Sequence, residues 1–150
     1  MNLFFDTSAL VKFFHEEVGT ETVSKLILDP NNSVWILELA RLEFLSSVFR
    51  RFRTRELDEG RLNTAIGSFE KQVENWNVEP LGRAVIEEAA NLMKDHAREH
   101  GLKALDAMHL GAFSLISEAN WALVAADDTL CEVAEILGYT TINPNMGNAQ

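Results

Sequence analysis

Short apolar runs alternate with longer amphipathic stretches along this chain of 150 residues. The alternation is typical of a parallel α/β domain, because buried parallel strands read as continuous apolar runs and the helices between them show one apolar stripe. Five runs are predicted to be strands, and they span residues 2–5, 33–36, 76–78, 121–126 and 139–142. The third is the weakest, since it is short and ends at Glu79-Pro80.

Helical periodicity fills the segments between these runs. The most regular segment spans 81–100 and is followed by Gly101, a residue typical of a helix C-terminus. Segment 104–116 is nearly all apolar and is predicted to be a helix buried on most sides, and 129–137 is predicted to be the last helix. A further helix is predicted over 38–53, with an apolar face formed by Leu39, Leu42, Leu45, Ser46 and Phe49.

The composition fits one compact domain, since 47% of the 150 residues are apolar. Residues 1–143 are assigned to that domain, and 144–150 are expected to form a flexible tail. Cys131 is the only cysteine, which excludes an intramolecular disulfide. We find neither an export signal nor the run of about 18 to 20 apolar residues that crosses a bilayer, so a cytoplasmic protein without membrane association is expected.

The formal net charge of −10 argues against a protein that binds nucleic acid by general electrostatic attraction. The basic residues are nevertheless unevenly placed. Six of the thirteen are arginines of one segment, namely Arg41, Arg50, Arg51, Arg53, Arg55 and Arg61. Arginine suits bidentate contacts with phosphates and carboxylates, so the segment is either a solvated helix face or a surface for RNA or a partner protein.

Four acidic residues stand where the surrounding sequence is apolar, and they are Asp6, Glu43, Asp106 and Asp127. A buried carboxylate costs several kcal/mol to desolvate unless it is paired. Asp6 and Asp127 directly follow predicted strands, and ligands of open α/β sheets bind at the C-terminal ends of strands. These acids are therefore predicted to share one site, of a kind that suits a hard divalent cation.

Neighbouring residues also have purely structural interpretations. Asp106 alone could simply stabilise the first turn of its helix. Thr7 or Ser8 is expected to cap the helix that follows Asp6, leaving that carboxylate free to face a cleft. A nucleophilic Ser8 is disfavoured, because no base and orienting group surround it. His109, one turn after Asp106, is interpreted as a hydrogen-bonded core residue that at most supports the site.

At these residues the chain resembles the PIN-domain nucleases, and among them the small VapC-type toxins of bacterial and archaeal toxin–antitoxin pairs. The family begins with a strand followed by D-T/S-S-A-L, matched here by FDTSAL at 5–10. The second family acid corresponds to Glu43 in ARLEFL at 40–45, and the third lies in LDAMHL at 105–110. The fourth ends the run LVAAD at 123–127, which is similar to the family's LVTAD. The resemblance spans most of the chain.

The resemblance implies a three-layer α/β/α domain with a five-stranded parallel sheet. It implies that the four acids converge around Mg²⁺ or Mn²⁺, with Asp6 and Asp106 as direct ligands and Glu43 and Asp127 holding metal waters or a second ion. The implied activity is hydrolysis of RNA phosphodiester bonds by the toxin of a toxin–antitoxin pair. The implied partners are the RNA substrate, a small antitoxin and a second copy of the chain.

Three positions keep alternatives open. Ala125 stands where the family often has Thr or Ser, which leaves room for a PIN fold that binds RNA or a partner protein without cleaving. Asp128 is interpreted as the cap of the last helix. The aromatic residues near the arginines are either core or a dimer contact, and they are Phe44, Phe49 and Phe52.

Two other classes with acids at strand ends fit the sequence poorly. A phosphate-transfer receiver domain needs a pair of acids after the first strand and a lysine near the last, whereas Thr7 follows Asp6 and the last strand leads to Asn143-Pro144. A phosphatase with an aspartyl nucleophile usually has a second Asp two residues after the first, where this chain has Ser8.

Overall fold

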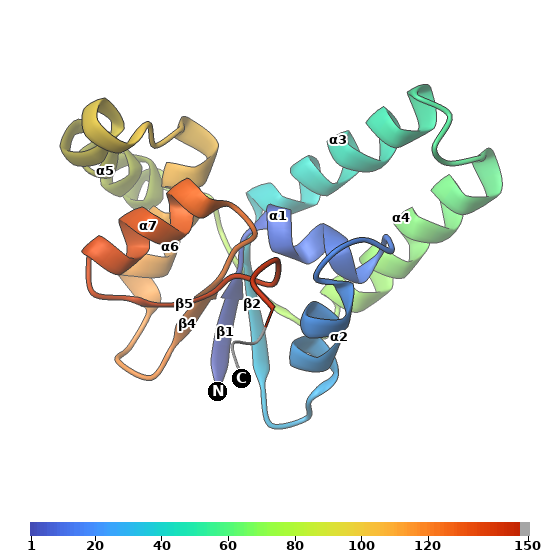
Figure 1. Ribbon diagram of the computed structural model, residues 1–150, viewed down its shortest axis with the longest axis horizontal. Coiled ribbons are helices and arrows are strands. Elements are labelled where there is room, and N and C mark those ends of the chain that lie inside the picture. Colours follow the sequence, from blue (N-terminus) through green and yellow to red (C-terminus); the bar gives the residue numbers. More distant parts are fainter. Residues whose placement is uncertain (148–150) are drawn as a thin grey trace.

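A five-stranded parallel sheet forms the middle layer of the structure, a computed structural model that describes residues 1–147 (Figure 1). The strands are β1 (Asn2–Phe5), β2 (Ser33–Leu37), β3 (Asn77–Glu79), β4 (Ala122–Val124) and β5 (Thr140–Ile142). Their order is β3-β2-β1-β4-β5, so the direction of winding reverses between β1 and β4. Open α/β sheets bind ligands at such a switch point, outside the carboxyl ends of the strands.

Helices cover both faces of the sheet (Figure 1). On one face lie α1 (Thr7–Leu10), the 3-10 turn η1 (Val11–Phe13), α2 (Thr20–Leu28), α3 (Leu39–Arg53) and α4 (Glu59–Val73). On the other lie α5 (Arg83–His100), α6 (Ala104–Ile116) and α7 (Asp128–Ile136). Strand β1 supplies both cores, because Leu3 and Phe5 join the first and Phe4 the second, as alternation along a strand requires. The predicted three-layer α/β/α fold and its five-stranded parallel sheet are confirmed.

Helix α3 buries a different face from the one predicted. Its buried side chains are Ala40, Phe44 and Val48, whereas Leu42 is 68% exposed and Phe49 is 43% exposed. Phe44 stacks on Phe69 of α4 with ring centroids 4.0 Å apart. The expected face was wrong because α3 packs against this aromatic cluster, and the sequence pattern of α3 alone does not show where that cluster lies. Phe44 was one of three aromatic residues suggested as a dimer contact. Its 1% exposure excludes that role.

Helices α5 and α6 pack unusually closely, and a glycine makes this possible. A Cβ atom at Gly111 of α6 would lie 3.1 Å from the backbone nitrogen of Ala89 and 3.3 Å from the carbonyl oxygen of Val85, both in α5. The predicted burial of α6 on most sides is confirmed, since its residues from His109 to Phe113 are all buried. The close contact holds α6, which carries Asp106 and His109, against α5.

The end of the described chain returns to the start of α2. Pro144 is buried, and a Cβ at Gly19, whose φ is +92°, would lie 2.8 Å from the Pro144 carbonyl oxygen. Residues 148–150 of the expected tail lie outside the described residues, so its flexibility stays a prediction. Over residues 1–147, no helix has the length and hydrophobicity needed to cross a membrane.

Candidate active site

Asp6 lies at the carboxyl end of β1, next to the end of β4. Its backbone N–H donates to the carbonyl oxygen of Val124 at 3.0 Å, and its side chain is almost fully buried. The carboxylate accepts hydrogen bonds from the Ala9 backbone N–H at 3.1 Å and from Ser8 Oγ at 2.7 and 2.8 Å. Asp6 is therefore itself the N-cap of α1, and the expectation that Thr7 or Ser8 would be the cap was wrong.

Ser8 joins the ends of the two central strands. Its hydroxyl donates to the Asp6 carboxylate and accepts the Ala126 backbone N–H at 3.0 Å. Ala126 is the second residue after β4 and directly precedes Asp127. The hydroxyl thus holds the chain that carries Asp127 beside the chain that carries Asp6, at the switch point of the sheet.

Glu43 is held by a threonine and a histidine from two other helices. Thr7 Oγ1 donates to Glu43 Oε1 at 2.8 Å, and His109 Nε2 lies 2.5 Å from the same oxygen and 3.3 Å from Thr7 Oγ1. Burial opposes ionisation of Glu43, but the hydrogen bond and charge of His109, with the Thr7 bond, outweigh it and hold the pKa of Glu43 below its ordinary value. The prediction that Glu43 reaches the site from the border of α3 agrees with this geometry.

His109 is a buried residue that contacts a site acid, as its interpretation as a hydrogen-bonded core residue supporting the site expects. It is 1% exposed, and within residues 1–147 its Nδ1 is the one buried side-chain N or O atom without a hydrogen-bond partner. The sequence signal was present, because His109 follows Asp106 by three residues in an otherwise apolar helix. What the pattern could not give was the partner, since Glu43 comes from 66 residues away.

Asp106 occupies the first turn of α6 and is half-buried. Burial is the main cause that raises its pKa to about 6, and the negative charges of Asp127, Asp6 and Glu43 raise it further against the opposing effect of His109. Burial also raises the pKa of Asp6, and the negative charge of Asp127 raises it further. Asp106 therefore lies close enough to the other three carboxylates that the sequence singled out to be affected by their charges.

Asp127 has a structural role besides its place in this group. It is the N-cap of α7, and its side chain accepts the Leu130 backbone N–H at 2.8 Å. Asp128 is instead the first residue of α7 and accepts a hydrogen bond from Asn143 Nδ2 at 3.0 Å. The prediction that Asp128 caps this helix was wrong, because the extended backbone that a cap needs occurs one residue earlier.

Ala125, the departure from the family pattern, is a core residue. Its side chain is fully buried in the core between the sheet and helices α5, α6 and α7. Its backbone N–H donates to Ile142 and its carbonyl oxygen accepts from Cys131 Sγ. The hydroxyl groups that order the acids here come from Thr7 and Ser8.

The donor set fits a divalent cation chemically. It consists of carboxylate oxygens alone, and their mutual repulsion would be relieved by a positive charge. As the side chains of residues 1–147 stand, no three Asp, Glu, His or Cys form a group arranged to hold a metal ion. Mg²⁺ commonly uses one or two carboxylates and keeps several waters, so it needs no such group of three.

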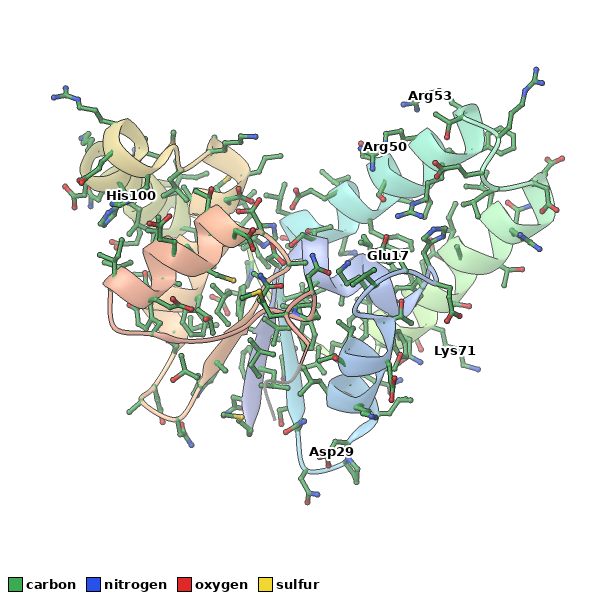
Figure 2. All side chains as sticks on the ribbon, viewed as in Figure 1. Glu17, Asp29, Arg50, Arg53, Lys71 and His100 are labelled. Atoms are coloured by element: carbon green, nitrogen blue, oxygen red, sulfur yellow. The ribbon has the colours of Figure 1, made fainter. Side chains whose placement is uncertain are left out.

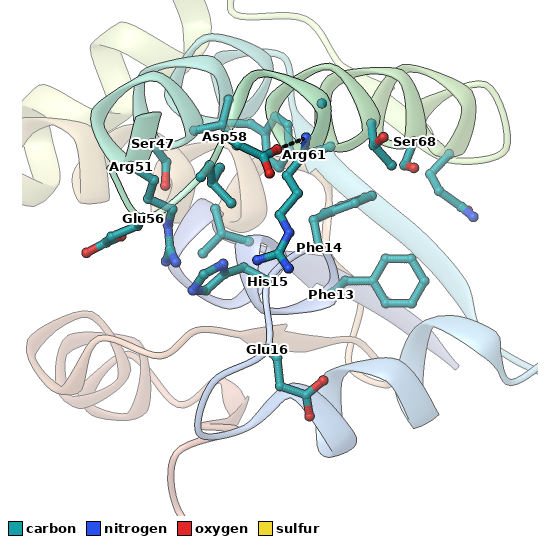
Figure 3. A pocket seen from close by; sticks show the side chains of 18 residues that line it. Phe13, Phe14, His15, Glu16, Ser47, Arg51, Glu56, Asp58, Arg61 and Ser68 are labelled. Carbon is teal, nitrogen blue, oxygen red and sulfur yellow. Dashed lines mark hydrogen bonds between the residues drawn. The ribbon is translucent and has the colours of Figure 1, made fainter. Parts of the chain in front are cut away.

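A large hollow lies away from the acids, between η1, α3 and α4 (Figure 3). Its volume is about 790 Å³, and its floor includes Phe14 and Phe44. Figure 3 shows the side chains of Arg51 and Arg61 extending toward His15 at its mouth. None of the four acids lines it.

Comparisons with known proteins agree with this architecture. The model of the PIN domain family matches residues 3–136. VapBC-1 from nontypeable Haemophilus influenzae superposes with a TM-score of 0.65 at 14% identity, over 97% of this chain and 100% of that chain. The sarcin-ricin loop cleaving toxin VapC20 of Mycobacterium tuberculosis gives 0.70 at 15% identity, over 95% and 99%.

VapBC2 from Rickettsia felis, bound to a DNA fragment from its promoter, gives a TM-score of 0.65 at 13% identity, over 95% of this chain and 98% of that chain. At such identities these likenesses show the fold alone. Among curated proteins, the chain finds no match.

Proposed function

This chain belongs to the PIN domain family, and from that membership we propose that it is a metal-dependent endoribonuclease and the toxin of a toxin–antitoxin pair. The observation that carries the proposal is the placement of half-buried Asp106 near three further carboxylates at the switch point of the sheet, where burial and their charges raise its pKa. Placing several carboxylates close together lowers the stability of the fold. Such a group therefore indicates a functional site that binds a cation.

Mg²⁺ or Mn²⁺ is the proposed cofactor, with Asp6 and Asp106 as direct ligands and Glu43 and Asp127 holding metal waters or a second ion. A bound ion of this kind would act as a Lewis acid and lower the pKa of a water molecule. The carboxylate of Asp6 is already oriented by Ser8 and the Ala9 N–H. The low pKa of Glu43 keeps it ionised at neutral pH, so it can accept a hydrogen bond from the attacking water.

The proposed partners are a small antitoxin, the RNA substrate and a second copy of the chain, in the cytoplasm. The likeness to two VapBC structures supports the antitoxin. A homodimer contact could use Phe49 and Phe52, which are 43% and 40% exposed on α3.

The alternative is a PIN domain that binds RNA or a partner protein without cleaving. Its support is Ala125, which packs into the core where the family often has a hydroxyl-bearing residue. The alternative therefore depends on the outcome of a cleavage assay.

That assay incubates the purified chain with a panel of structured RNAs in Mg²⁺, Mn²⁺ or EDTA. The variants are Asp6→Asn and Asp106→Asn, and the matched control is Asp95→Asn, an exposed acid on α5. We expect cuts that need metal, that both site variants lose and that the control retains. Cuts that persist in the site variants would indicate a contaminant. No cleavage of any RNA by the parent, with its fold intact, would favour the binding module.

A further inference from the structure

Helix α3 carries a stripe of polar side chains that begins at half-buried Glu43 and continues through exposed residues away from the acidic site. Glu43, Ser46, Arg50 and Arg53 recur at spacings of three, four and three residues, so they follow one edge of the helix. Arg53 lies ten residues after Glu43, which is about 15 Å along the helix. The first residue of the stripe belongs to the candidate active site, and the last two are cations.

Arg50 and Arg53 are free to bind a ligand. Both are exposed, and among the described residues neither takes part in an ion pair. Figure 2 shows both on the side of α3 that faces away from α4. Their neighbour Arg51 differs, because its guanidinium is largely buried and donates to Glu17 at 3.4 Å.

Two acids, Glu17 and Glu56, lie near Arg50, and among the described residues neither forms an ion pair with it. Arg50 lines a hollow of about 450 Å³ together with His15, Glu17, Arg51, Thr54 and Glu56. Within this hollow Glu17 already pairs with Lys12 at 3.2 Å and with Arg51. Residues 39–55 contain five arginines and one acid, Glu43, although the net charge of the whole chain is −10.

A site built from carboxylates needs positive charge nearby if it is to hold RNA. One or two divalent ions can neutralise the acids and the phosphate that reacts, but the phosphates on either side of it would still be repelled. Arginine forms bidentate hydrogen bonds with phosphate oxygens. The exposed cations of the α3 stripe could receive the flanking phosphates, because the stripe begins at the site itself.

We propose that the α3 stripe from Glu43 to Arg53 is the surface along which the RNA backbone leaves the active site, with Arg50 and Arg53 binding its phosphates. The inference rests on the proposed ribonuclease function and adds the path of the substrate. A simpler role exists for these arginines, since cations in the last turn of a helix interact favourably with the helix dipole. Arg98, exposed in the last turn of α5, would have that simpler role alone.

The test measures RNA binding in EDTA, where cleavage is absent. A fluorescein-labelled single-stranded RNA of 20 nucleotides and mixed sequence is titrated with the parent, the double variant Arg50→Gln/Arg53→Gln and the control Arg98→Gln at several salt concentrations. Each phosphate contact on single-stranded nucleic acid contributes about 0.7 to the slope of log K against log salt, so the double variant should lower that slope by about 1.4. Its affinity should fall on the order of tenfold in low salt, and Arg98→Gln should match the parent.

The inference is overturned if the double variant keeps the parent's affinity and slope, or if Arg98→Gln loses as much as the double variant. It is also overturned if the folded parent shows no salt-dependent RNA binding, which would assign the stripe to an acidic protein partner. If the parent binds RNA through these arginines but never cleaves it, the proposed ribonuclease function is wrong and the proposed RNA-binding surface stands. Thermal melts of all three proteins should coincide, which shows that binding differences do not arise from unfolding.

Discussion

His109 Nε2 lies 2.5 Å from Glu43 Oε1, and this contact joins α6 to α3 at the edge of the acidic site. The same carboxylate oxygen accepts the hydroxyl of Thr7 from α1. Three helices that are distant in sequence therefore fix the orientation of one acid. Partners of this kind, which orient a metal-site carboxylate without touching the metal, typically change affinity or activity about 10 to 100-fold when they are removed.

The first expectation concerns this contact. His109→Leu keeps an apolar side chain in the buried position but removes the donor, so Glu43 should lose its orientation and its pKa should rise. We expect the rate of RNA cleavage to fall about 10 to 100-fold. His109→Gln, which retains a donor, should recover part of that loss. If both variants fold and His109→Leu cleaves at the parent's rate, the contact does not support the site.

The second expectation concerns the stability of the metal-free protein. The pKa of Asp106 is raised from 3.8 to about 6, so the folded chain binds this proton more tightly than the unfolded chain. The free energy of unfolding should therefore decrease as the pH rises through that interval. In the Asp106→Asn variant the side chain at position 106 is uncharged at every pH. In EDTA the variant should melt higher than the parent at pH 7.5 and lose this advantage near pH 4.

Thermal unfolding at the two pH values checks this, and Asp95→Asn, an exposed acid on α5, is the control that should follow the parent. An Asp106→Asn variant that is no more stable than the parent at pH 7.5 would show that the acids do not repel one another as described.

The third expectation concerns Ser8, which ties the end of β1 to the end of β4. Ser8→Ala removes the hydroxyl that donates to Asp6 and leaves the Ala126 N–H without its acceptor. We expect urea unfolding to show a loss of about 1 to 3 kcal/mol, the range for a buried group left unsatisfied. Ser114→Ala, which removes a local bond to Gly111 within α6, should cost less than Ser8→Ala. Equal losses would mean that Ser8 has no special role.

The fourth expectation concerns the contact between α5 and α6. Gly111→Ala places a Cβ 3.1 Å from the Ala89 backbone nitrogen, so one helix must move. We expect a loss of about 1 to 3 kcal/mol in unfolding free energy and a decrease in cleavage, because Asp106 and His109 share α6. Gly67→Ala is the matched control, since a Cβ there meets nothing within 4 Å. It should raise stability by about 0.5 to 1 kcal/mol. A Gly111→Ala variant with the parent's unfolding free energy and cleavage rate would contradict the close packing of α5 and α6.

The layers of the fold were predictable because they depend on short-range patterns. The apolar runs around Leu3 and Leu123 are continuous since both strands are buried on two faces, and that burial identifies them as parallel strands. The two acids that end these strands then follow from the sheet alone. For this reason the general position of Asp6 and Asp127 could be inferred from the sequence.

The finer features depend on backbone angles and on distant partners. Asp6 rather than Thr7 caps α1, and Asp127 rather than Asp128 caps α7, because the extended backbone falls one residue earlier than the residue types suggest. Helix α3 turns Phe44 inward because Phe69 meets it there. No pattern within a single element contains this information.

Binding of Mn²⁺ tests the central claim most directly, which is that the four acids form one metal site. Calorimetric titration at pH 7.5 would compare the parent with Asp6→Asn, Asp106→Asn and the exposed-acid control Asp95→Asn. We expect the parent and the control to bind Mn²⁺ alike and the two site variants to bind it at least about tenfold more weakly. A folded parent that binds no Mn²⁺, or four proteins that bind it equally, would contradict the account.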